Sequence, residues 1–214
     1  MYNQMLINPI FYRVFKVFIN IHMNLTEPQI TQKSQECFDF WFKDVGVTGH
    51  NHGYMSKSCF MFEHVLLGML KPASGHFMQM GTNFGVSFDI LYRQYGNRCI
   101  GIDLWNPLDH PNIIEKDIYD LEDMNLGFCN VDAGDFRWTP ELRMFSIDYA
   151  MRNVVLKGGI IFTAGGNFVN ECLGLNLYEY FEDNGFTMKN YYNFTDKKPL
   201  LDIGVENELI AISS

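Results

Sequence analysis

One stretch before the middle of the chain limits the possible folds most, because apolar runs and glycines alternate there in a fixed order. An apolar run at 77–80 ends in the turn Gly81–Gly85, and a helix-like stretch at 87–95 follows. A second apolar run, 99–102, ends at Asp103. Strand, glycine turn, helix, strand and acid is the order of a nucleotide-binding βαβ unit. The turn lets a ligand approach bare backbone, and the acid can accept hydrogen bonds from a ribose.

The alternation of strands and helices continues toward the C-terminus. Further strands are predicted at 113–117, 126–131 and 160–163, and helices at 139–155 and 169–183. Thr139-Pro140 and Asn184-Gly185 are the start and stop signals of these helices. Two last strand-like runs, 186–194 and 201–212, are joined by a turn. The predicted fold class is α/β: a Rossmann-like parallel sheet with helices on both faces and an antiparallel C-terminal edge hairpin.

The first part of the chain is predicted to be an N-terminal helical extension, residues 1–45, ahead of a Rossmann-like domain at 46–214. Its apolar run at 5–23 is interrupted by Pro9, Arg13 and Lys16. The run is too short and too charged for a membrane span. We expect it to pack on the domain or on a second copy of the chain, which would make a homo-oligomer.

The net charge and the cysteine content indicate which partners are disfavoured and which cellular compartment is expected. The net charge is −9, from 16 basic and 25 acidic residues, which disfavours a nucleic acid partner. The five cysteines are odd in number and show no zinc-ligand spacing. Three of them, Cys99, Cys129 and Cys172, lie in apolar segments and are expected to act as small hydrophobes. A reducing compartment, the cytoplasm, is therefore predicted.

Four motifs resemble those of class I S-adenosylmethionine (SAM)-dependent methyltransferases over residues 46–214. They are QMGTNFG at 79–85, GIDLW at 101–105, VDAGD at 131–135 and LKGGIIFT at 156–163. The closing antiparallel pair also matches the edge hairpin of that family. GIDLW together with VDAGD is most similar to the small-molecule O-methyltransferase branch. The resemblance implies SAM as the cofactor and methyl transfer to an oxygen or nitrogen of a small-molecule acceptor.

The resemblance also implies a set of site residues. The expected cofactor-binding residues are Gln79, Gly81, Thr82, Asn83, Gly85, Asp103, Leu104, Trp105, Asp117 and Ile118. Among them, Asp103 would hold the ribose hydroxyls. Asp132 is expected to face the transferred methyl and to act as the catalytic base. Its neighbours Asp135, Arg137 and Trp138 could shape the acceptor pocket, and His50 or His52 is a second choice for the base.

The sequence departs from the family pattern at three places, which keeps alternatives open. Gln79 stands where an acid is expected, and Asn83 occupies the middle position of the glycine turn. Thr163-Ala164 stands where the metal-dependent branch carries an acid, so no metal site is predicted. A cofactor-binding or interaction module without turnover is one alternative. An NAD-dependent oxidoreductase is another, because Asp103 would serve either cofactor.

Overall fold

The computed structural model describes residues 67, 72–83, 85–107, 109–132, 139–163, 173–189 and 209–214. The predicted N-terminal extension and its boundary at residue 45 lie outside these residues, as do His50, His52 and Cys172. Those interpretations therefore stay predictions. In the described ranges, no helix is both long enough and apolar enough to cross a membrane.

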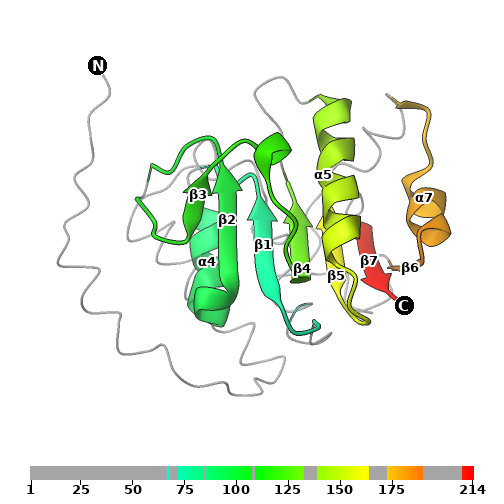
Figure 1. Ribbon diagram of the computed structural model, residues 1–214, viewed down its shortest axis with the longest axis horizontal. Coiled ribbons are helices and arrows are strands. Elements are labelled where there is room, and N and C mark those ends of the chain that lie inside the picture. The colour runs from blue at the N-terminus through cyan, green and yellow to red at the C-terminus, as the bar shows by residue number, and fades with distance from the viewer. Residues whose placement is uncertain are drawn as a thin grey trace, which may run out of the picture.

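The described part of the chain contains one seven-stranded sheet, in the order β3-β2-β1-β4-β5-β7-β6 (Figure 1). The strands are β1 (His76–Met80), β2 (Cys99–Asp103), β3 (Ile113–Glu115), β4 (Leu126–Val131), β5 (Ile160–Thr163), β6 (Phe186–Lys189) and β7 (Leu209–Ser213). Strands β1 to β5 pair in parallel, whereas β7 runs antiparallel to both β5 and β6. The predicted parallel sheet with an antiparallel C-terminal edge is confirmed.

Helices cover both faces of the sheet, as predicted (Figure 1). They are α4 (Val86–Tyr95), α5 (Pro140–Asn153) and α7 (Leu177–Asp183), with short 3-10 turns η4 (Gly96–Arg98) and η5 (Ile118–Asp120). Successive strand residues point to opposite faces. Phe77 therefore packs in one buried cluster with Phe88 of α4, and Met78 packs in the other with Ile147 of α5 and Phe181 of α7. Each such burial stabilises the fold by about 1.5–3 kcal/mol.

Two cysteines predicted to act as small hydrophobes do so. Cys99 of β2 and Cys129 of β4 are fully buried, one in each cluster. The Cys99 thiol lies 3.6 Å from the Leu91 carbonyl oxygen, to which it donates. Burial raises the pKa of the Cys129 thiol, so this side chain stays neutral in the core.

The register of the three central strands brings their carboxyl ends to one edge of the sheet. Met80 pairs with Ile102 of β2 on one side and with Val131 of β4 on the other. The residues that follow these three are Gly81, Asp103 and Asp132. They emerge together at the edge where open α/β sheets bind ligands, beside the strand at which the sheet order changes direction.

Two predicted elements are shorter than the sequence pattern indicated. The helix predicted at 169–183 is interrupted: Leu173 is helical, Gly174 adopts a φ of 62°, Asn176 is extended, and α7 begins at Leu177. The Asn176 side chain accepts hydrogen bonds from the Tyr178 and Glu179 amides, so it starts a helix rather than continuing one. Likewise β3 ends at Glu115, before the predicted strand end at 117. The predicted strands at 186–194 and 201–212 are described only at 186–189 and 209–212.

Candidate functional site

The glycine turn after β1 is built from residues with positive φ. Gly81, Asn83 and Gly85 have φ angles of 81°, 50° and 78°. Glycine adopts such angles without steric cost, and asparagine tolerates them better than most residues. The Gly81 amide donates to the Ile102 carbonyl at 2.9 Å, and the Gly85 amide donates to the Thr82 carbonyl at 2.7 Å. These bonds fix the turn against the end of β2.

The turn and its neighbour hold the carboxylate of Asp103 in one orientation. The backbone N–H of Asn83 donates to Oδ2 at 2.6 Å, and the Thr82 hydroxyl donates to the same oxygen at 3.4 Å. The Leu104 N–H donates to Oδ1 at 2.7 Å. Each carboxylate oxygen can accept two hydrogen bonds. Oδ1 therefore keeps capacity for a hydroxyl donor such as a ribose.

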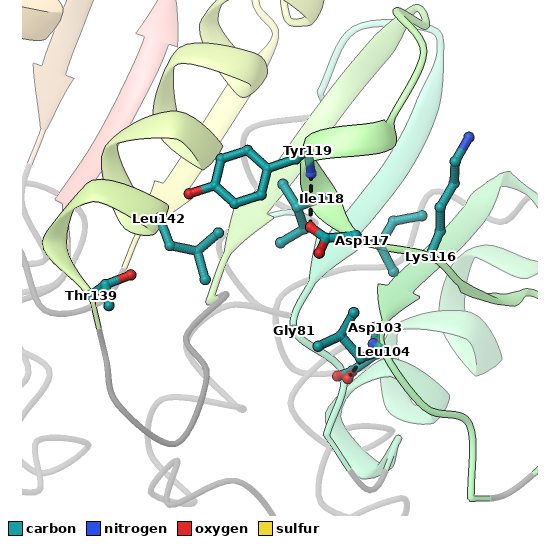
Figure 2. Close-up of a pocket in the computed structure, with 10 residues that line it drawn as sticks. Gly81, Asp103, Leu104, Lys116, Asp117, Ile118, Tyr119, Thr139 and Leu142 are labelled. Carbon is teal, nitrogen blue, oxygen red and sulfur yellow. Dashed lines mark hydrogen bonds between the residues drawn. The ribbon is translucent and has the colours of Figure 1, made fainter.

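A cavity of about 210 Å³ opens beside Asp103 (Figure 2). It is lined by Gly81, Ile102, Asp103, Leu104, Lys116, Asp117, Ile118, Tyr119, Thr139 and Leu142. Its lining combines aliphatic and aromatic side chains with the carboxylates of Asp103 and Asp117 and the ammonium of Lys116. Whole-ligand pockets usually measure roughly 300–1,000 Å³. The cavity thus suits one part of a ligand, the size class of a nucleoside.

Another part of the cavity lining comes from the turn η5 and its N-cap residue Asp117. The Asp117 carboxylate accepts a hydrogen bond from the Tyr119 amide at 3.0 Å, which caps the turn (Figure 2). The Tyr119 side chain is 54% exposed, yet its ring packs on Phe145 of α5 with the ring centroids 4.5 Å apart. An exposed ring held in this way offers a fixed apolar surface for a planar group.

The structure brings five of the predicted cofactor-binding residues into one wall. They are Gly81, Asp103, Leu104, Asp117 and Ile118. Thr82 and Asn83 stand behind this wall and hold Asp103.

The other predicted residues are not part of the cavity wall. Gln79 is 1% exposed, and its amide nitrogen donates to the Gly81 carbonyl at 3.3 Å. Gly85 is buried at the start of α4, and Trp105 is 42% exposed. Gln79 and Gly85 therefore shape the turn from within.

Several residues that line the cavity were not predicted from the sequence. Lys116 and Tyr119 flank the predicted pair Asp117-Ile118, and Thr139 and Leu142 come from the start of α5. The Thr139-Pro140 pair predicted where the helix begins, but it did not predict which residues lie close to that helix start in the fold. Placing the first turn of α5 at the carboxyl edge of a parallel sheet would have found Thr139 and Leu142.

Asp132 lies at the same sheet edge, directly after β4. Its backbone N–H donates to the Met80 carbonyl at 3.0 Å. Its side chain is 20% exposed, and Oδ1 lies 3.7 Å from Nη2 of Arg143. Arg143 is 2% exposed, and its Nη1 donates to the Val131 carbonyl. Arg143 had not been predicted as part of the site.

The electrostatics of Asp132 suit a group that exchanges protons near neutral pH. Burial raises the pKa of its carboxyl to about 6, and the positive charge of Arg143 opposes this rise. At pH 7 the carboxylate is mostly ionised and can accept a proton. Asp132 is not a member of the cavity wall, and its predicted neighbours Asp135, Arg137 and Trp138 lie outside the described residues.

Across the described ranges, no group of three or more His, Cys, Asp or Glu side chains could hold a metal ion. The expectation of a metal-free site stays a prediction.

Comparisons with known proteins identify proteins of similar structure. No protein-family model matches the sequence, and no curated protein matches it. A "putative O-methyltransferase" from Klebsiella pneumoniae is similar in structure, with 9% identity, full coverage of both chains and a TM-score of 0.51. A SAM-dependent methyltransferase from Clostridium acetobutylicum matches 86% of this chain and 99% of its own, with 10% identity and a TM-score of 0.46. The likeness to the Klebsiella pneumoniae protein shows that this chain has an α/β methyltransferase-like fold.

Proposed function

We propose that the protein transfers a methyl group from SAM to an oxygen or nitrogen of a small-molecule acceptor. The observation that carries the proposal is the anchored carboxylate of Asp103 in the lining of a cavity that also has apolar and aromatic side chains. In this proposal the carboxylate accepts hydrogen bonds from the ribose hydroxyls, and Ile118 and Tyr119 contact the adenine. The fold agrees with this assignment.

The residues present fit a nucleoside better than a dinucleotide. In a dinucleotide site the N–H groups of the glycine turn point at a pyrophosphate. Here the Asn83 N–H donates to Asp103 at 2.6 Å instead. SAM carries no pyrophosphate and does not need that donor. This contact favours SAM over NAD.

The chain's own residues would supply alignment and proton removal. When bound, SAM supplies a sulfonium methyl: the acceptor lone pair bonds to that carbon, the S–C bonding pair stays on sulfur, and S-adenosylhomocysteine is left. Asp103 and the cavity wall hold the nucleoside so that the acceptor meets the methyl in line. Asp132 accepts the proton that the acceptor loses.

Calorimetry tests the binding step directly. We expect SAM and S-adenosylhomocysteine to bind the full chain, and NADH not to bind. Absence of binding by both SAM and S-adenosylhomocysteine at saturating concentration would reject the proposal. Tight binding of NADH alone would favour an oxidoreductase instead.

One observation favours a second candidate, a cofactor-binding module without turnover. Asp132 is paired with Arg143 and is not in the cavity wall. Transfer of a radiolabelled methyl from SAM to components of a small-molecule extract separates the two candidates. Label transfer that is lost in Asp132→Ala supports the enzyme. Binding without any label transfer supports the module.

A further inference from the structure

Arg143 is a buried charge, and buried charges need compensation. The guanidinium stays protonated at any relevant pH, and taking such an ion out of water costs several kcal/mol. Its side chain is 2% exposed and lies in the first turns of α5, where its backbone N–H donates to the Thr139 carbonyl at 3.2 Å. Two groups that compensate it are the Val131 carbonyl and the Asp132 carboxylate.

Three elements meet at this point of the sheet edge. From α5, Arg143 reaches the carbonyl of Val131 and the carboxylate of Asp132. From β5, the Thr163 hydroxyl donates to the same Val131 carbonyl at 3.3 Å. From β1, the Met80 carbonyl accepts the Asp132 N–H at 3.0 Å. Of these groups only Arg143 carries a charge toward Asp132, since the Thr163 hydroxyl and the Met80 carbonyl do not titrate near neutral pH.

We propose that Arg143 is a positioning residue for methyl transfer, which fixes the Asp132 carboxylate at the end of β4 and keeps it ionised to accept the acceptor's proton. The inference rests on the proposed function. Loss of a facing positive charge disfavours the ionised carboxylate. An Arg143→Met variant would therefore hold Asp132 protonated at pH values where the unmodified protein has it charged.

The direct test is a carbon-13 NMR titration of the Asp132 carboxyl in the ligand-free protein, assigned with Asp132→Asn. We expect Arg143→Met to raise the titration midpoint by about 1–3 pH units, the range that an opposite charge produces. Arg143→Lys keeps the positive charge, so its Asp132 midpoint is expected to lie close to that of the unmodified protein. The acid limb of kcat against pH should move upward in Arg143→Met by the same amount, with KM for SAM little changed.

Two matched variants separate a charge effect from a packing effect. Thr163→Val removes the hydrogen bond from the Thr163 hydroxyl to the Val131 carbonyl without changing any charge. Arg152→Met removes a positive charge from the exposed end of the same helix. Neither should move the Asp132 midpoint by more than a few tenths of a unit. If Thr163→Val or Arg152→Met moves it as far as Arg143→Met, the proposal is overturned.

The variants also cover the case in which Arg143→Met does not fold. A folded Arg143→Lys protein whose Asp132 midpoint lies more than about one unit higher would show that charge is not the cause, and would overturn the proposal. A midpoint close to that of the unmodified protein supports it. Calorimetry with S-adenosylhomocysteine on the same samples keeps the two claims apart. Binding with an unmoved midpoint in Arg143→Met rejects only this inference, whereas absence of binding in the unmodified protein rejects the proposed function.

Discussion

At the scale of single residues, Asp103 both stabilises the fold and forms part of the candidate site. Its carboxylate accepts two backbone N–H groups and one hydroxyl, so it closes the glycine turn onto β2. The same carboxylate faces the cavity. A residue with both duties affects stability and affinity together when it is replaced.

We expect Asp103→Ala to weaken S-adenosylhomocysteine binding by roughly 10- to 100-fold, because a hydrogen bond to a charged group contributes about 1.5–3 kcal/mol. Calorimetry measures the change, and circular dichroism checks that the variant is folded. Glu115→Ala is the matched control, since Glu115 pairs with Asp103 in the sheet and is exposed. Equal affinity of Asp103→Ala and the control would contradict ribose binding by Asp103.

His110 is a second residue whose protonation state follows from its contacts. It is 3% exposed, and its Nδ1 accepts a hydrogen bond from the Asn112 N–H at 3.1 Å, which requires that nitrogen to be unprotonated. The rings of Phe88 and Tyr92 lie edge-on to it, with centroids 5.1 and 4.6 Å away. Burial lowers the pKa of His110 below 6.5, although Asp89 opposes the shift.

Because the pKa of His110 is lowered in the folded protein, His110 makes the stability depend on pH. Below pH 6.5 the unfolded chain binds a proton that the folded chain does not, so this contribution is complete above pH 6.5 and is lost as the pH falls. Between pH 6.5 and 5.5 the loss is at most about 1.4 kcal/mol. Urea unfolding at pH 7.5 and 5.5 should show a smaller pH effect for His110→Phe than for the unmodified protein. Asp132, whose pKa is raised, acts in the opposite direction in both proteins and cancels in the comparison.

At the scale of elements, close packing between β2 and α4 sets the position of the glycine turn. A Cβ atom on Gly101 would lie 2.8 Å from side-chain carbons of both Thr82 and Ile113, and 3.1 Å from a ring carbon of Phe88. Such distances force neighbours to move. Because Thr82 contacts Asp103, a disturbance here reaches the site.

We expect Gly101→Ala to lower the free energy of unfolding by about 1–3 kcal/mol, the usual cost of overpacking a core. Urea unfolding measures this loss. It should also weaken S-adenosylhomocysteine binding. Thr187→Ala, at an exposed position of β6, is the control and should stay within about 0.5 kcal/mol. A Gly101→Ala protein as stable as the control would mean that the neighbouring side chains relax freely.

Element prediction from the sequence worked where the signal is local. The apolar runs gave β1, β2, β4 and β5, and Thr139-Pro140 marked the start of α5. At 169–183 it missed an interruption: residue 173 and residues 177–183 are helical, but 174–176 are not. Gly174 and Asn176 favour a break and a new N-cap, and the described residues contain both.

Site prediction was limited by contacts between distant elements. Asp103 could be found because a strand-end acid after a glycine turn is a local pattern. Tyr119 and Leu142 could not, because their meeting depends on how η5 and α5 lie across the sheet edge. The pairing of Arg143 with Asp132 is of the same kind, since an arginine in a helix usually faces solvent.

At the scale of the whole molecule, the proposed cofactor should stabilise the fold by mass action. A ligand that binds only the folded state at about 100 times its Kd adds roughly 2.7 kcal/mol. We expect S-adenosylhomocysteine to raise the Tm with increasing concentration and NADH to leave it unchanged, as measured by differential scanning fluorimetry. In Asp103→Ala the same rise should require a higher ligand concentration. A Tm that does not respond to S-adenosylhomocysteine would argue against binding.

The cavity has the end of β2 with η5 on one side and the first turn of α5 on the other. The ring contact of Tyr119 with Phe145 and the burial of Ile118 against α5 already connect the two sides. A molecule that fills the cavity would add a further contact between them. With the molecule bound, the amide hydrogens of η5 and of the start of α5 would exchange with solvent more slowly than in the ligand-free protein. Both segments would slow together, although they are some twenty residues apart along the chain.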